Sequence, residues 1–92
     1  MKSAREIAMM TKEASDKMLT QRHEDTMDYI NSMMLPEIEK QAKAGEVRAK
    51  FRISEQRFDR ELIRKEFEAH GYEVTIKGYE VSISWLSIFV RL

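Results

Sequence analysis

Apolar residues in the first half of the chain recur every three or four positions, the spacing of one side of a helix. There are two such stripes: Ile7, Met10, Ala14 and Met18, then Met27, Ile30, Met34 and Ile38. Ser3 precedes Glu6 by three residues, which is the spacing of a capping box. Gly45 follows the second stripe, where a left-handed C-terminal cap belongs. The pattern therefore predicts helix between Ser3 and Gly45.

Two features leave the course of this helical region open. Residues 20–25 are polar all round, so they could form a turn between two helices or an exposed stretch of one long helix. Pro36 removes a backbone hydrogen bond and clashes with the preceding turn when it lies inside a helix. It could equally begin a fresh short helix over residues 36–44.

The second half of the chain alternates apolar and polar residues with the period of two that is typical of strands. Val47, Ala49, Phe51 and Ile53 alternate with basic residues in the first predicted strand. A helix is then expected over residues 55–70, with Ser54 as its cap and Gly71 at its end. Its inner side is expected to carry Phe58, Leu62 and Phe67.

The last two predicted strands flank Gly78 and form a hairpin. If Lys77 and Gly78 are a two-residue turn, Val74 faces Val81 across the hairpin. The same register puts Ile76 opposite Tyr79 and Tyr72 opposite Ile83. All six side chains then lie on one face of the sheet. A register shifted by one residue is disfavoured, since it would turn the apolar side chains of one strand to solvent.

These elements predict an α+β fold: a long N-terminal helix or helical hairpin followed by a β-α-β-β unit with a small three-stranded sheet. Residues 1–45 are expected to be a helical oligomerisation region and residues 46–92 the β-α-β-β part of one compact unit. The helix at 55–70 is long enough to cross over and cover the apolar face of the sheet. The apolar segment 86–92 either continues the third strand or docks on something.

Composition narrows the classes of protein. The chain has 92 residues and no cysteine, and 16 basic residues balance 16 acidic ones. A single domain of this length has a thin core, and without cysteine it has no disulfide or thiolate metal site. It has neither the roughly 18-residue apolar run of a membrane span nor the apolar core of a signal peptide, so we expect a cytoplasmic protein. A neutral chain does not indicate nucleic-acid binding.

The apolar stripes exceed what a thin single-chain core requires. A straight helix over residues 4–44 would be about 60 Å long, so it must fold back on itself or pack against another copy. Folding back requires a sharp turn in residues 20–26, which contain neither glycine nor proline. We therefore favour a homo-oligomer. Its expected interface is Ile7, Met10, Met18, Met27, Ile30, Met34 and Ile38.

Basic residues gather around the first strand and the following helix. The candidate anion-binding residues are Arg48, Lys50, Arg52, Arg57, Arg60 and Arg64. Guanidinium groups match the geometry of phosphates, but i,i+4 pairs such as Arg64 with Glu68 are also the usual pattern of an exposed helix surface. His23 and His70, the only histidines, are expected to be surface or helix-terminal residues. No catalytic residues, metal site or cofactor are expected.

Four short motifs lie in the N-terminal helix, at the end of the helical region, after the second predicted helix and at the end of the last predicted strand. They are Thr11-Lys12-Glu13-Ala14, Ala44-Gly45, Gly71-Tyr72-Glu73-Val74 and Ile83-Ser84-Trp85. Together they resemble a type of small phage-encoded protein whose members end soon after the tryptophan, whereas this chain continues to Leu92. The resemblance implies a non-enzymatic accessory protein that binds and inhibits a host or anti-phage defence component. The alternative hypothesis is a sponge-like protein that binds an anionic signalling nucleotide through arginines near a subunit interface.

Overall fold

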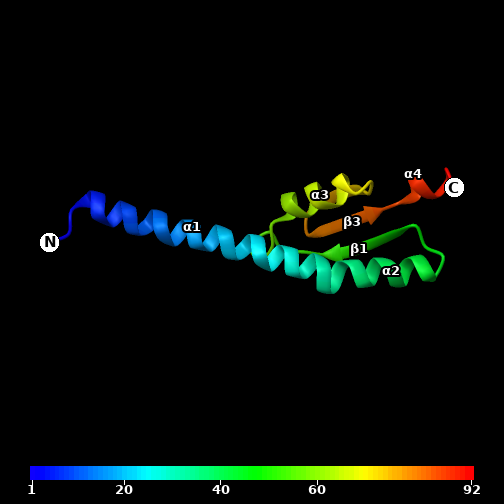
Figure 1. The fold of residues 1–92 in the computed structure, drawn as a ribbon, viewed down its shortest axis with the longest axis horizontal. Coiled ribbons are helices and arrows are strands. Elements are labelled where there is room, and N and C mark those ends of the chain that lie inside the picture. Colours follow the sequence, from blue (N-terminus) through cyan, green and yellow to red (C-terminus); the bar gives the residue numbers. More distant parts are fainter.

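The computed structural model describes all residues from 1 to 92. Its elements are α1 (Ala4–Tyr29), the π-helical turn η1 (Ile30–Met34), α2 (Leu35–Lys43), β1 (Arg48–Arg52), α3 (Arg60–Ala69), β2 (Glu73–Lys77), β3 (Glu80–Ser84) and α4 (Leu86–Phe89). The predicted α+β class, with a long N-terminal helix before a β-α-β-β unit, is confirmed. Figure 1 shows that the helix extends well beyond the sheet, in a molecule measuring 66 × 21 × 20 Å.

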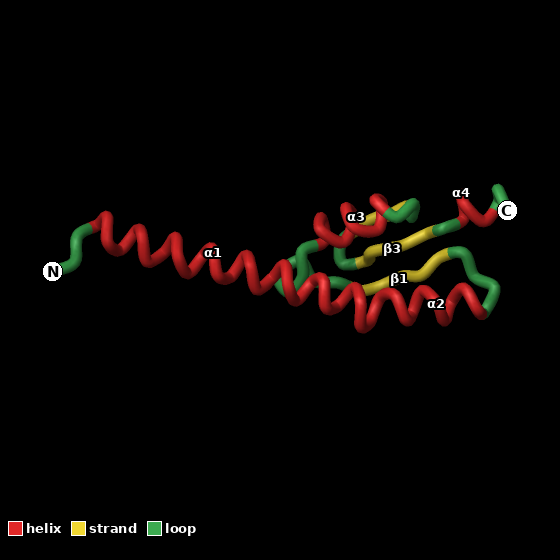
Figure 2. The backbone as a smooth tube through the Cα atoms, in the orientation of Figure 1, coloured by secondary structure: helices red, strands yellow, loops and turns green.

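The first three elements form one continuous helix, without a turn at residues 20–26. Figure 2 shows it running unbroken past α3 and the sheet. Ser3 caps its start as predicted, since its hydroxyl accepts a hydrogen bond from the Glu6 N–H at 3.2 Å. Despite its length, neither this helix nor any other has the apolar stretch needed to cross a membrane.

Pro36 lies in the first turn of α2, directly after the wide turn η1. In a regular α-helix its ring would meet the carbonyl of Ser32. Here the Leu35 N–H bonds to the carbonyl of Ile30, five residues earlier, so the turn before the proline holds an extra residue. The helix therefore continues through Pro36 instead of breaking there.

The helix ends at the predicted glycine cap. Gly45 has φ +86°, and the N–H groups of Gly45 and Glu46 bond to the carbonyls of Ala42 and Gln41 at 3.0 Å each. This pair of bonds is a Schellman motif, which needs a left-handed residue at the position of Gly45. The chain reverses here and returns as β1 beneath α2.

The sheet has the order β1-β3-β2, with both pairs antiparallel. β1 and β2 therefore run in the same direction on either side of β3, and α3 carries the chain from one edge to the other. The directly opposed residues place Ala49, Phe51, Val74, Ile76, Val81 and Ile83 on one face. The basic residues of β1 lie on the other face.

The predicted register of the hairpin is wrong by two residues. Val74 pairs with Ile83 and Ile76 with Val81, so the turn is Gly78-Tyr79 and not Lys77-Gly78. Gly78 has φ +58° at the first central position of the turn, the place that a type II′ turn gives to glycine. A shift by two residues keeps the faces as predicted, but it moves Tyr79 out of the apolar face and leaves it 65% exposed.

The predicted start of the second helix is also wrong. α3 begins at Arg60 and is capped by Asp59, whose carboxylate accepts from the N–H groups of Glu61 and Leu62 at 3.1 and 3.2 Å. Ser54 instead accepts a bond from Gln56 within a turn. The turn at residues 54–58 is held by contacts to α1, which a local pattern does not reveal. Of the helix's own residues, Ile63 and Phe67 are buried in the core.

The core lies between the apolar sheet face and the helices η1, α2 and α3. It contains Ile30, Met34 and Ile38 of the long helix packed with the sheet residues and α3. These three residues were expected at an interface with another chain, and that expectation is wrong because their own domain buries them. The return of the chain at Gly45, and not a turn in residues 20–26, brings the sheet under this half of the helix.

The last residues neither continue β3 nor pack into the core. After Trp85 they form the short helix α4, and the chain ends at the far side of the domain from the N-terminus (Figure 1). Leu86, Ile88, Phe89, Val90 and Leu92 all remain exposed.

Candidate functional site

Residues 1–21, here named the arm, project from the domain (Figure 1). The end nearest the domain borders the turn before α3, where Ser15, Met18, Leu19 and Gln21 line a hollow with Glu55, Gln56 and Arg57. Every residue of the arm is exposed. Its large apolar side chains are no exception: Ile7, Met10 and Met18 are 49%, 51% and 73% exposed. Of the seven residues expected at an interface, these three are therefore uncovered. Met27, beyond the arm, lies at the edge of the core.

The direction of the arm is fixed where the helix meets the turn before α3. One guanidinium nitrogen of Arg22 donates to the backbone carbonyls of Glu55 and Phe58, the latter at 3.1 Å. The rings of Tyr29 and Phe58 stack with centroids 4.4 Å apart. Arg22 and Tyr29 are two helical turns apart on the same side of α1, so the turn before α3 holds the helix at two points and fixes the direction in which the arm leaves the domain.

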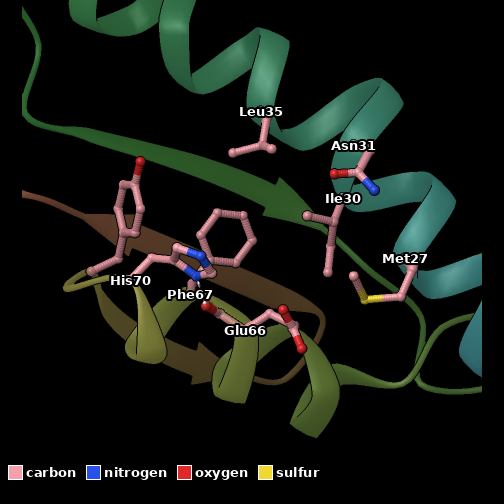
Figure 3. A pocket seen from close by; sticks show the side chains of 8 residues that line it. Met27, Ile30, Asn31, Leu35, Glu66, Phe67 and His70 are labelled. Carbon is pink, nitrogen blue, oxygen red and sulfur yellow. Dashed lines mark hydrogen bonds between the residues drawn. The ribbon is translucent and has the colours of Figure 1, made fainter.

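A hollow separates the long helix from α3. Figure 3 shows Met27, Ile30 and Asn31 of the long helix facing Glu66 and Phe67 of α3 and His70, the residue directly after it. The hollow has a volume of about 360 Å³, and Leu35 and Tyr72 complete its lining. The buried side chains of Ile30 and Phe67 contribute to its floor. It is thus apolar below and polar at its rim.

Two further hollows continue this one towards the C-terminus. The second, of about 320 Å³, shares His70 and Tyr72 with the first and adds Ile38, Glu39, Ala42, Gly71, Trp85 and Ile88. The third, of about 280 Å³, shares Ala42, Trp85 and Ile88 with the second and adds Gly45, Glu46, Val47, Phe89 and Leu92. We name the three together the furrow. It follows the long helix from Met27 to Gly45.

The rim of the furrow carries acidic groups and one histidine. Glu39, Glu46 and Glu66 line it, and neither lysine nor arginine does. The Nδ1 of His70 lies 2.8 Å from the backbone carbonyl of Glu66. A carbonyl only accepts, so Nδ1 carries the hydrogen of this bond. The furrow can therefore bind an apolar segment that brings cations or hydrogen-bond donors along its edges.

The six candidate anion-binding residues do not converge on one site. Arg48, Lys50 and Arg52 project from the open face of the sheet. Arg60 and Arg64 belong to α3 on the opposite side of the sheet. Arg60 bonds to the Gly78 carbonyl and pairs with Glu55 at 3.1 Å. Arg64 bonds to the Val74 carbonyl and pairs with Glu61 and Glu68. Arg57, in the turn before α3, lies over the Phe58 ring at 5.2 Å.

The open face of the sheet is a small grid of polar residues. Its three rows across β1, β3 and β2 are Arg48-Ser84-Glu73, Lys50-Ser82-Thr75 and Arg52-Glu80-Lys77. Lys50 pairs with Glu80 at 3.7 Å, and both side chains are about half exposed. Such exposed pairs contribute little stability. The face therefore offers four cations and three hydroxyls to an anion, with two carboxylates among them.

Neither clusters of metal-binding side chains nor similarity to known proteins assigns a ligand or a function to these surfaces. No group of three or more histidine and acidic residues is placed to hold a metal ion. No protein-family model matches the chain, and no curated protein or solved structure matches it.

Proposed function

We propose that this chain is a non-catalytic binding protein that assembles as a homo-oligomer through its arm. One observation carries the proposal: a helical arm whose large apolar side chains all lie in water. Burying apolar surface contributes about 25 cal/mol per Å². A partner that covers Ile7, Met10 and Met18 would therefore recover stabilisation that the isolated chain forgoes.

The arm also lacks the usual support of a solvated helix. All four ion pairs of the structure involve residues from 50 onwards, so none lies in the arm. In folded proteins most of the stability of a helix comes from packing of its apolar side against other elements. An arm that packs against another chain would gain that support.

The biological setting that we propose is a phage-infected bacterial cytoplasm, where the oligomer binds and inhibits a host or defence component. The four motifs quoted above and their similarity to small phage-encoded proteins support this setting. A pull-down from host lysate with the wild-type chain as bait would test it, with the arm variant described next as the matched bait. Failure to retain any host protein on the wild-type bait would count against the setting and leave the assembly untouched.

Assembly is tested by light scattering of two matched double variants. Ile7→Asp with Met10→Asp places two charges in the stripe. Ala8→Asp with Ser15→Asp places two on a side turned by about 100°. We expect the first to reduce the wild-type mass towards that of one chain, 10.9 kDa, and the second to retain the assembly. Neither variant should unfold the domain, because all four residues are exposed. A wild-type mass of one chain at tens of micromolar would refute the proposal.

Binding of an anionic nucleotide is a second candidate, favoured by the four cations around the hydroxyls of the open sheet face. Arg48→Ala with Arg52→Ala should then abolish the rise in melting temperature that the nucleotide causes. The melting temperature of the free protein should hardly change, because both side chains are exposed. A screen of nucleotides and polyanions in which none protects the protein would remove this candidate.

A further inference from the structure

We propose that the arm of one chain lies in the furrow of a second copy, and that two chains exchange arms in this way. The inference rests on the proposed homo-oligomer and names the surface that covers its arm. It also gives the exposed apolar residues of the C-terminal segment a role, because Ile88, Phe89 and Leu92 line the third hollow of the furrow.

The two surfaces belong to one chain but cannot meet within it. The arm lies at one end of a molecule 66 Å long, and the furrow follows the other half of the same helix (Figure 1). The contacts of Arg22 and Tyr29 hold the arm in line with that helix. Only another chain can therefore bring an arm to the furrow.

The arm and the furrow match in length. The helical part of the arm, residues 4–21, is about 27 Å long at about 1.5 Å per residue. The stretch of long helix that borders the furrow, Met27 to Gly45, is about the same length. An arm docked along the furrow would thus run from the first hollow to the third without overhang.

The surfaces also match in chemistry. The apolar side chains of the arm follow at the i, i+3, i+7 and i+11 positions, Ile7, Met10, Ala14 and Met18. Side chains at this spacing are the anchors of a helix that docks in an apolar groove. The furrow presents aromatic and aliphatic walls, among them Phe67, Tyr72 and Trp85. Methionine side chains adapt readily to such irregular walls.

Charge complements this match and indicates a direction. The arm carries four cations, Lys2, Arg5, Lys12 and Lys17, against three carboxylates. The furrow has only carboxylates among its fully charged groups, Glu66 at one end and Glu39 and Glu46 towards the other. If the arm runs antiparallel to its partner's helix, Arg5 comes to Glu39 and Glu46, and Lys17 comes to Glu66.

Pairing of two arms with each other is the less favourable alternative. A two-stranded coiled coil needs apolar residues in a heptad pattern over at least three or four heptads. In the arm the heptad positions are occupied by Ile7, Met10 and Ala14 and then by the polar residues Lys17 and Gln21. The apolar seam therefore ends after two helical turns. The furrow offers a wider apolar surface to the same stripe.

In a dimer of two antiparallel chains, both arms and both furrows are occupied. Each arm covers the furrow of its partner, and the two contacts are identical, as in a symmetric dimer. In this arrangement Ile7 of one chain comes near Ala42 of the other, and Met18 comes near Asn31. These two pairings distinguish the docked arm from paired arms.

The native chain has no cysteine, so single introduced cysteines report contacts directly. Ile7→Cys chains are mixed with Ala42→Cys chains of different tag length and oxidised. We expect a mixed disulfide between the two, and none when Ala69→Cys, on the exposed side of α3, replaces Ala42→Cys. Disulfides between Ile7→Cys chains alone, without the mixed product, would overturn the docked arm while leaving the homo-oligomer in place.

A second experiment blocks the furrow without altering the arm. Ala42 is exposed and lines two of the hollows, so Ala42→Arg should fill the furrow and weaken self-association by about tenfold or more. Ala69→Arg is the matched control and should leave the association constant unchanged. Equal association of the two variants would overturn the inference, whereas a monomeric wild-type chain in light scattering would overturn the proposed function as well.

Discussion

The hydroxyl of Thr26 accepts a hydrogen bond from the backbone N–H of Asp59 at 2.9 Å. The same hydroxyl donates to the carbonyl of Arg22 at 2.7 Å, and Thr26 has no exposed surface. Asp59 is the residue that caps α3. One buried side chain of the long helix thus holds the backbone at the point where α3 begins, and it links the base of the arm to the rest of the domain.

Thr26→Val should destabilise the domain by about 1–3 kcal/mol, because the shape of the side chain is kept but the Asp59 N–H loses its acceptor. Denaturation in urea would measure the free energy of unfolding. Thr26→Ser retains the hydroxyl and should recover most of the lost stability relative to Thr26→Val. If the valine and serine variants were equally unstable, the hydrogen bond would not be the cause.

Tyr29 should make stability depend on alkaline pH. Burial raises the pKa of Tyr29 above its ordinary value of 10.0, and the charge of Arg57 offsets part of that effect. The unfolded chain therefore releases this proton at lower pH than the folded one. The corresponding stability is present below about pH 10 and is lost as the pH rises through the folded pKa.

The phenylalanine variant isolates this contribution. Tyr29→Phe keeps a ring to stack on Phe58 but does not titrate. The unfolding free energy is compared between about pH 9 and about pH 11.5, a range that spans the ordinary tyrosine pKa of about 10. Over this range the unfolding free energy of Tyr29→Phe should fall less steeply than that of the wild type. Parallel curves for the two proteins would show that Tyr29 ionises alike in both states.

Arg60 and Arg52 should differ in their effect on stability, although both were candidates for anion binding. Arg60 joins the turn before α3 to the hairpin turn through Glu55 and the Gly78 carbonyl. Arg60→Ala should cost about 1–2 kcal/mol, because the Gly78 carbonyl loses a charged donor. Arg52→Ala, on the open face, should change stability by no more than about 0.5 kcal/mol. Thermal melts of the two variants would make the comparison.

The faces of the sheet can be tested with one substitution on each. Val81 is fully buried in the core, so Val81→Lys should cost roughly 3 kcal/mol or more and unfold much of the population. Thr75→Lys lies on the exposed face opposite Ser82 and should be tolerated. Circular dichroism of the two variants at one temperature would separate them. Loss of signal in both would contradict the assigned faces.

Local signals in the sequence predicted the features that depend on neighbouring residues. Ser3 and Gly45 mark the ends of the long helix because capping needs only a hydroxyl or a glycine a few positions away. The alternation along the strands predicted their faces. It could not settle the register of the hairpin, since a shift by two residues keeps the strand residues on the same faces and changes only the residues of the turn. The positive φ of Gly78 and the exposure of Tyr79 decide the register in the folded chain.

Contacts between distant residues explain what the sequence did not reveal. Asp59 rather than Ser54 caps α3 because Thr26 and Arg22, more than 30 residues earlier, bind the backbone before it. The second apolar stripe became core because β1 returns under it. The furrow was missed as a site for the same reason. Its walls come from the long helix, α3 and the C-terminal segment, and no spacing along the chain brings Asn31, Glu66 and Trp85 together.

The wide turn before Pro36 has a rotational consequence. Its extra residue turns everything before it by about 100° about the helix axis, relative to an uninterrupted α-helix. Deleting one residue from Ile30–Met34 would turn the arm's stripe in another direction, and with it Arg22 and Thr26, which would leave their partners in the turn before α3. Met10 lies about 30 Å from this turn along the helix. A single residue inside the domain thus sets the azimuth at which a distant apolar surface meets its partner.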